Sequence, residues 1–120
     1  MEHYENTINL FKAVMNKAIR DLEVSKKDFG QNGKVRKIVS KIDEVEQGAI
    51  YRNRYGYVIK KDHLAYQILA LKREYIENND FFYSKRCKEL CGYIDLDYDF
   101  LVETLRKRNL LKEKGYEPIL

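Results

Sequence analysis

A chain of 120 residues is long enough to bury one hydrophobic core but too short for two. Hydrophobic residues make up 44% of it and charged residues 35%, which excludes a disordered chain and predicts a folded, mainly helical protein. Acidic residues follow Met1 closely and charge interrupts every apolar stretch, so we expect a cytoplasmic protein with no targeting signal and no contact with a membrane.

The first half of the chain predicts two amphipathic helices. Residues 4–23 form the first helix, with apolar residues at helical spacing, namely Ile8, Leu10, Phe11, Val14, Met15, Ala18, Ile19 and Leu22. Residues 25–33 lack periodicity and contain two glycines, which predicts a linker. A second helix is expected from about Lys34 to Gln47, where Gly48 ends it.

Residues 49–61 differ in character, because their apolar members are β-branched or aromatic. This pattern predicts either a short β-hairpin near 50–60 or a flexible loop. Cations and rings alternate here, as is typical of contacts with a nucleic acid. The same tyrosines could instead brace the segment against the helices while the arginines face water.

A third helix is expected to run to about Glu77, with Asp62 as its N-terminal cap. Its broad apolar surface predicts that it forms the centre of the core. Residues 78–80 are expected to end this helix. The tail, residues 110–120, is expected to be loosely ordered unless the core or a partner subunit takes up its apolar residues, Leu110, Leu111, Ile119 and Leu120.

Residues 84–108 predict two short helices joined by a turn, as in a helix-turn-helix unit. Ser84 and Asp97 are placed to cap these helices, and Asp95 stands where the usual unit has a glycine in the left-handed conformation. The inward residues share one face, namely Cys87, Leu90, Cys91, Ile94, Leu96, Leu101 and Leu105. The two cysteines are therefore expected to pack as small apolar groups, with no disulfide, metal or cofactor.

Together these elements predict a mainly α protein, a compact bundle of about five helices in a single domain spanning residues 1–120. Residues 72–108, including REYIENNDFFYSKRCKELCGYIDLDYDFLVETLRKR, resemble the C-terminal half of a loose group of small phage and prophage proteins. AVMNKAIRDL, at residues 13–22, resembles their opening helix. The resemblance implies a helix-turn-helix-like nucleic-acid binder with no established reaction. The chain departs from the group at Asp95 and Tyr98, where the group has glycine and proline.

The net charge is only +4, but the cations are clustered, which is typical of surfaces that contact phosphates and also of solvated helix faces. Residues 95–103 contain four acids and no cation, which argues against ordinary insertion of the second helix of the unit into a DNA groove. We therefore expect DNA to be held by residues around this unit, namely Arg52, Arg54, Tyr55, Lys60, Lys61, Lys85, Arg86, Lys88 and Arg106.

The alternative is a protein-binding inhibitor or adaptor that docks on a host or phage protein through an acidic surface, formed by Asp97, Tyr98, Asp99 and Glu103. An enzyme is not expected, because the chain has no phosphate-binding glycine loop and no nucleophile signature, and His3 and His63 are far apart in sequence. A homodimer is compatible with either function, since helix-turn-helix proteins often act in pairs.

Overall fold

The computed structural model describes residues 2–119, with side chains from residue 5 onward. The described chain is mainly helical and contains no β-strand. Its elements are α1 (Glu2–Asp28), α2 (Lys34–Glu46), α3 (Lys61–Asp80), the 3-10 turn η1 (Phe81–Tyr83), α4 (Lys85–Tyr93) and α5 (Tyr98–Lys107). The predicted mainly α class is confirmed. No helix within residues 2–119 has both the length and the apolar character needed to cross a bilayer.

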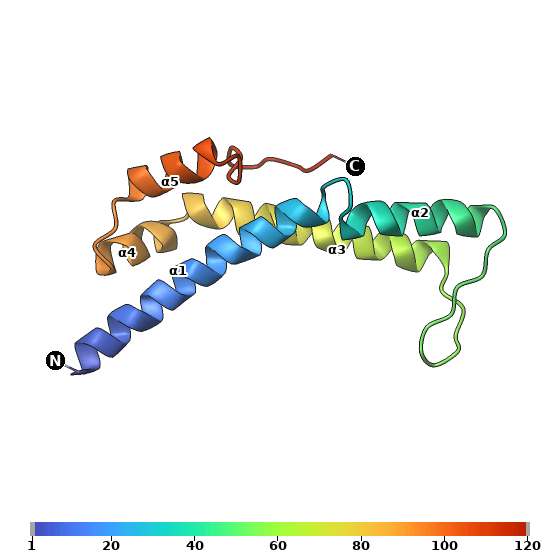
Figure 1. Ribbon diagram of the computed structural model, residues 1–120, viewed down its shortest axis with the longest axis horizontal. Coiled ribbons are helices and arrows are strands. Elements are labelled where there is room, and N and C mark those ends of the chain that lie inside the picture. The colour runs from blue at the N-terminus through green and yellow to red at the C-terminus, as the bar shows by residue number, and fades with distance from the viewer. Residues whose placement is uncertain (1, 120) are drawn as a thin grey trace.

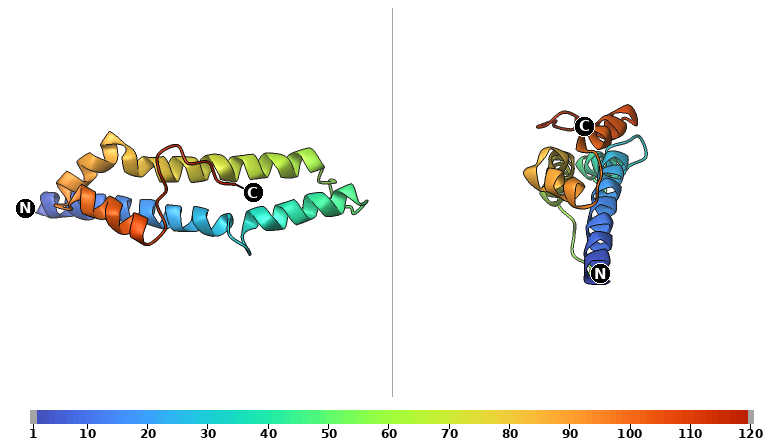
Figure 2. Two further views of the ribbon diagram at one scale, coloured as in Figure 1. Left: turned by 90° about the horizontal axis from the view of Figure 1, so that it is seen from above. Right: turned by 90° about the vertical axis from the view of Figure 1, so that its left-hand side faces the viewer.

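The helices form an elongated molecule rather than the compact bundle that was expected. α1 and α2 lie nearly end to end, and α3 runs beside both of them (Figures 1 and 2). The extents are 62 × 31 × 21 Å and the radius of gyration is 18.6 Å, against about 13–14 Å for a compact domain of this length. The reason is that α2 and the first half of α3 extend beyond α4 and α5 and pack mainly against each other (Figure 1).

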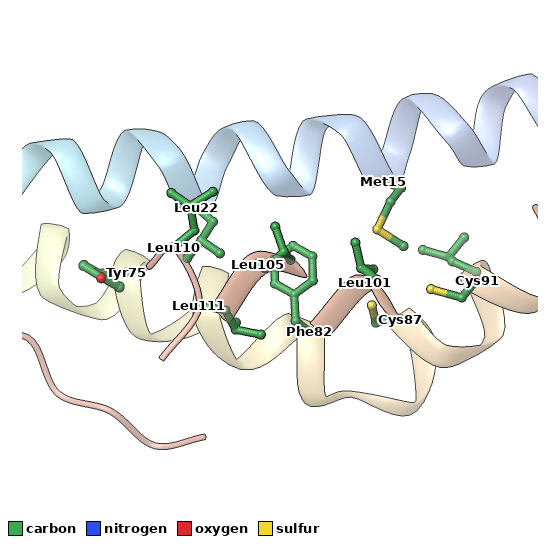
Figure 3. Packing of buried hydrophobic residues seen from close by; sticks show 11 residues of the cluster. Met15, Leu22, Tyr75, Phe82, Cys87, Cys91, Leu101, Leu105, Leu110 and Leu111 are labelled. Atoms are coloured by element: carbon green, nitrogen blue, oxygen red, sulfur yellow. The ribbon is translucent and has the colours of Figure 1, made fainter. Parts of the chain in front are cut away.

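The core lies at the other end, between α1, the end of α3, α4 and α5 (Figure 3). Its buried residues come from all of these elements and from the segment after α5, namely Met15, Leu22, Tyr75, Phe82, Cys87, Leu90, Cys91, Leu101, Leu105, Leu110 and Leu111. Removal of such side chains from water is the main force that holds these elements together. Leu10, which was assigned to the apolar stripe of the first helix, is instead exposed.

α1 is longer than predicted, because Ser25 does not begin a linker. Ser25 is buried, and its Oγ accepts a hydrogen bond of 2.9 Å from Nδ2 of Asn78 in α3. The turn between α1 and α2 is confined to residues 29–33. A Cβ atom at Gly33 would lie 2.2 Å from the carbonyl oxygen of Asp28, so only glycine fits this close approach of the two chain segments.

α3 is also longer than predicted at both ends. Its N-cap is Lys60, which provides no side-chain cap, and Asp62 lies within the first turn. At the other end the helix continues through Asn79, whose side chain is fully buried. Oδ1 of Asn79 accepts from the backbone N–H of Lys112 at 2.8 Å, so a contact with a distant segment satisfies a residue that locally favours a turn.

The tail after α5 is held against the core in its first part. Leu110 and Leu111 are buried, Tyr83 donates its hydroxyl to the Lys112 carbonyl at 2.7 Å, and Asp80 accepts from the Gly115 N–H at 3.0 Å. The core therefore takes up two of the four apolar residues of the tail. Ile119 is exposed, and Leu120 lies outside the described residues.

Both caps predicted for residues 84–108 are confirmed. Oγ of Ser84 accepts from the N–H of Cys87 at 3.2 Å, and Oδ1 of Asp97 accepts from the N–H of Phe100 at 3.1 Å. Asp95 adopts the left-handed conformation, with φ 56°, and the following N–H bonds back to the carbonyl of Cys91 at 2.9 Å. This is the Schellman arrangement that ends many helices.

The predicted β-hairpin near residues 50–60 is wrong. A single antiparallel bridge, Arg52 to Val58, is present, and the remainder of the segment is a loop. Oδ1 of Asn53 accepts from the backbone N–H groups of both Tyr55 and Tyr57, at 2.9 and 3.1 Å, which makes a tight turn. Beside the bridge, only the N–H groups of Asn53 and Ile59 bond across the loop, to the carbonyls of Tyr57 and Tyr51, and α3 begins two residues after Ile59.

Candidate nucleic-acid interface

The protruding helix pair and its loop, residues 34–70, form a basic arm. It contains eight cations and four acids, so it carries the whole net charge of +4, while the remaining residues contain fifteen of each. All eight cations are exposed, namely Lys34, Arg36, Lys37, Lys41, Arg52, Arg54, Lys60 and Lys61. Two basic clusters that are separate in the sequence thus lie on one structural unit (Figure 1).

One edge of α2 is a row of lysines. Lys34, Lys37 and Lys41 occur at helical spacing and share this edge. Among the described residues none of the three forms an ion pair. Nζ of Lys41 lies 5.7 Å from the centroid of the Tyr51 ring, so the row leads into the loop at the end of the arm.

The tip loop, residues 51–60, presents two arginines in an ordered backbone. Nη1 of Arg52 donates to the carbonyl of Gly56 at 2.9 Å. Nη2 of Arg54 donates to the hydroxyl of Tyr55 at 2.8 Å, and its guanidinium lies 4.9 Å from that ring. A guanidinium has five N–H donors, so both arginines retain donors for a phosphate.

Lys60 and Lys61 differ in their availability. Lys60 is exposed and has no ion pair within the described chain, whereas Nζ of Lys61 lies 2.5 Å from Oε1 of Glu46. The hydrogen bond and the charge of Glu46 raise the pKa of Lys61. Lys61 therefore joins the ends of α2 and α3 and contributes less free charge than its neighbour.

A groove of about 670 Å³ lies between the tip loop and the first turns of α3. Asn53, Tyr57, Val58, Ile59, Lys60, Asp62, His63, Tyr66 and Gln67 line it. Tyr57 belongs to the alternating rings and cations expected to contact a nucleic acid, whereas Tyr66 was not identified from the sequence as a site residue. The available signal was that Tyr66 lies on the polar side of its helix, away from the buried Leu64 and Ile68.

The other predicted DNA contacts lie at the opposite end of the molecule, on α4 and α5 (Figures 1 and 2). Lys85 and Arg86 are exposed, while Nζ of Lys88 lies 5.3 Å from the centroid of the Tyr98 ring. Arg106 donates to the hydroxyl of Tyr83 from Nε at 3.2 Å and from Nη2 at 2.8 Å, and this contact raises its pKa. The predicted set therefore splits into two groups that do not form one site.

The predicted acidic surface consists largely of residues with bonds inside the protein. Asp97 caps α5, and the Tyr98 hydroxyl donates to the carbonyl of Phe82 at 2.5 Å. Glu103 pairs with Lys107 at 3.0 Å. Asp99 forms no ion pair with a described residue, and it lies beside Phe100, whose side chain is 63% exposed.

Cys87 and Cys91 are buried and free, as predicted. Burial disfavours the thiolate and raises the pKa of Cys87 to about 12, which makes this thiol a poor nucleophile. Among the described side chains no group of three His, Cys, Asp or Glu residues is placed to hold a metal ion. His63 lines the groove, while the side chain of His3 lies outside the described residues.

The fold and this surface define an all-helical protein with a basic two-helix arm. No family model, curated protein or solved structure matches the chain. The resemblance to small phage proteins therefore stays a prediction.

Proposed function

We propose that the protein binds nucleic acid, in particular DNA, through the basic arm. The observation that carries this proposal is that residues 34–70 contain the entire net positive charge on a structure that protrudes from the core. Lysine and arginine neutralise phosphates and release condensed counterions, which favours binding at low salt. The unpaired lysine row of α2 and the arginines of the tip loop are the main contacts.

The dimensions of the arm favour contact with the DNA backbone over insertion into a groove. Two packed helices are about 20 Å across, since each is about 10 Å in diameter, whereas the major groove is about 12 Å wide. The helix pair is therefore too wide to enter, and it lies along the phosphates. Only the tip loop is narrow enough to reach toward the bases.

In this proposal the predicted helix-turn-helix unit, residues 84–108, supports the fold and does not read DNA sequence. Leu101 and Leu105 bury one face of α5 in the core. The opposite face carries Asp99, Phe100 and Glu103, which repel phosphates or offer them no donor.

The test is the salt dependence of DNA binding in two triple variants of equal charge. Lys34→Gln with Lys37→Gln and Lys41→Gln removes the α2 row. The matched control changes Lys12, Arg20 and Lys114 to glutamine; these residues are exposed, outside the arm and free of ion pairs within the described chain. The first variant should lower the slope of log affinity against log salt by about 2–3, at about 0.9 per phosphate contact. Equal slopes in the two variants, or no binding of any DNA by the wild type at low salt, would refute the proposal.

A second function is favoured by the exposed Phe100 beside Asp99, an arrangement suited to a basic protein partner. Under this alternative, Asp99→Lys with Phe100→Ser should abolish capture of one stoichiometric partner from nuclease-treated lysate. The α2 triple variant should retain that partner. If instead the α2 triple variant loses the partner and the Asp99→Lys, Phe100→Ser variant retains it, the partner binds to the arm.

A further inference from the structure

Two exposed tyrosines face a common groove at the end of the arm. Tyr57 comes from the tip loop and Tyr66 from α3, and their side chains are 73% and 72% exposed. Both line the groove of about 670 Å³, and within the described residues neither ring packs against another aromatic ring. The groove therefore has exposed tyrosine side chains from two elements, at the end of a basic structure.

The polar residues of this groove match the edge of a nucleobase. The Oδ1 atom of Asn53 is occupied by two backbone N–H groups, which leaves its amide N–H donors free. Gln67 adds a second amide, and Asp62 adds an acceptor suited to an exocyclic amino group. Lys60 on the rim supplies a cation for the adjoining phosphate.

The groove is largely preformed. The N–H of Asn53 bonds to the carbonyl of Tyr57 at 2.9 Å, and the N–H of Ile59 bonds to the carbonyl of Tyr51 at 2.8 Å. The loop is thus ordered before a ligand arrives, which reduces the entropy lost on binding. The volume also lies within the roughly 300–1,000 Å³ that is usual for small-molecule sites.

We infer that this groove holds an unpaired nucleobase, stacked against Tyr57 and Tyr66, and that the protein prefers single-stranded DNA to duplex. The inference rests on the proposed function, since the arm supplies the phosphate contacts. Stacking needs a free base face, and every base has one, so the site is tolerant of sequence. A duplex base is unavailable unless it is flipped out, at a cost of a few kcal/mol.

The test measures fluorescence anisotropy of a labelled oligodeoxycytidine, whose bases carry an exocyclic amino group, and of a mixed-sequence duplex of the same length. Tyr57→Leu and Tyr66→Leu keep apolar bulk but remove the stacking face. Each should weaken single-strand binding by about 5- to 150-fold, from about 1–3 kcal/mol per stacked base, and leave duplex binding within about twofold. Tyr57→Phe should restore single-strand binding. Tyr93→Leu, an exposed ring at the other end, is the control and should have no effect.

The outcomes separate this inference from the proposed function. If the wild type binds both DNAs and the leucine variants bind the single strand as tightly as the wild type, the base site is refuted while the basic arm stands. The base site is also refuted if the variants lose single-strand and duplex binding equally, because the rings would then contact the DNA backbone and not a base. If the wild type binds neither DNA at low salt, both proposals fall.

Discussion

Asn79 and Lys112 exchange two hydrogen bonds between one side chain and the backbone of one residue. Oδ1 of Asn79 accepts from the Lys112 N–H at 2.8 Å, and Nδ2 donates to the Lys112 carbonyl at 3.2 Å and to the Glu113 carbonyl at 3.1 Å. The side-chain amide of Asn79 thus bonds to the backbone of Lys112 as the backbone of a neighbouring β-strand would. It ties the end of α3 to the segment after α5 and closes the core over Leu110 and Leu111.

Replacement of Asn79 by alanine should therefore be strongly destabilising. The buried peptide groups of the tail would lose their partner, and each unsatisfied group costs about 1–3 kcal/mol. We expect the free energy of unfolding to fall by about 2–4 kcal/mol in urea denaturation. Asn32→Ala, in the exposed turn between α1 and α2, should change it by less than about 0.5 kcal/mol. Similar values for both variants would show that the Asn79 contacts contribute nothing.

Asn79 also illustrates what the sequence could not reveal about the fold. Local preference assigned 78–80 to a turn, whereas Asn79 is helical and its side chain bonds to the distant backbone at 112–113. Ser25 was misplaced for the same reason, because its partner is Asn78. Ser84 and Asp97 were predictable, since their capping bonds reach only three residues along the chain.

The candidate site also has one part that was predictable from the sequence and one part that was not. The basic composition around Arg52 and Arg54 is a local signal and was predictable. That the lysines of α2 share an arm with these arginines, while those of α4 do not, depends on the path of α3 (Figure 2). The sequence could mark Tyr66 as an exposed ring, but its place in the same groove as Tyr57 depends on the fold.

The end of α4 predicts a stabilising substitution, Asp95→Gly. Asp95 has φ 56°, a conformation that costs a side-chain-bearing residue about 1 kcal/mol and glycine nothing. Allowing for the greater freedom of glycine when unfolded, we expect a gain of several tenths of a kcal/mol in the free energy of unfolding. Arg20→Gly, at an exposed position inside α1, should instead lose about 1 kcal/mol. A loss in both variants would contradict the strain argument.

Stability should fall in alkaline solution because of Cys87. Burial raises the pKa of this thiol from 9.0 to about 12, so between these values it is protonated when folded and ionised when unfolded. Its stabilising effect is complete below pH 9 and is lost as the pH rises toward 12. The raised pKa values of Tyr75 and Tyr98 act in the same direction.

Urea denaturation under reducing conditions, near neutral pH and at about pH 10.5, measures this effect. Cys87→Ala removes the thiol, so the variant should lose about 2 kcal/mol less than the wild type between the two conditions. The variant is expected to be less stable at neutral pH because of the space left in the core, and the comparison therefore uses the change with pH. An identical change in both proteins would contradict the assignment to Cys87.

Asn53→Ala should loosen the tip loop while leaving the core intact. The alanine variant loses the oxygen that accepts from the N–H groups of Tyr55 and Tyr57, and the loop lies far from the core along the arm. Hydrogen exchange measured by NMR should be faster at these two amides and unchanged at Leu22 and Leu105. Because the variant loop must become ordered on binding and the amide donors of Asn53 are lost from the groove, single-strand affinity should fall by at least about 2- to 12-fold, from about 0.5–1.5 kcal/mol of ordering alone. Gln31→Ala, in the turn after α1, is the control. Unchanged exchange at Tyr55 and Tyr57 would show that Asn53 does not order the loop.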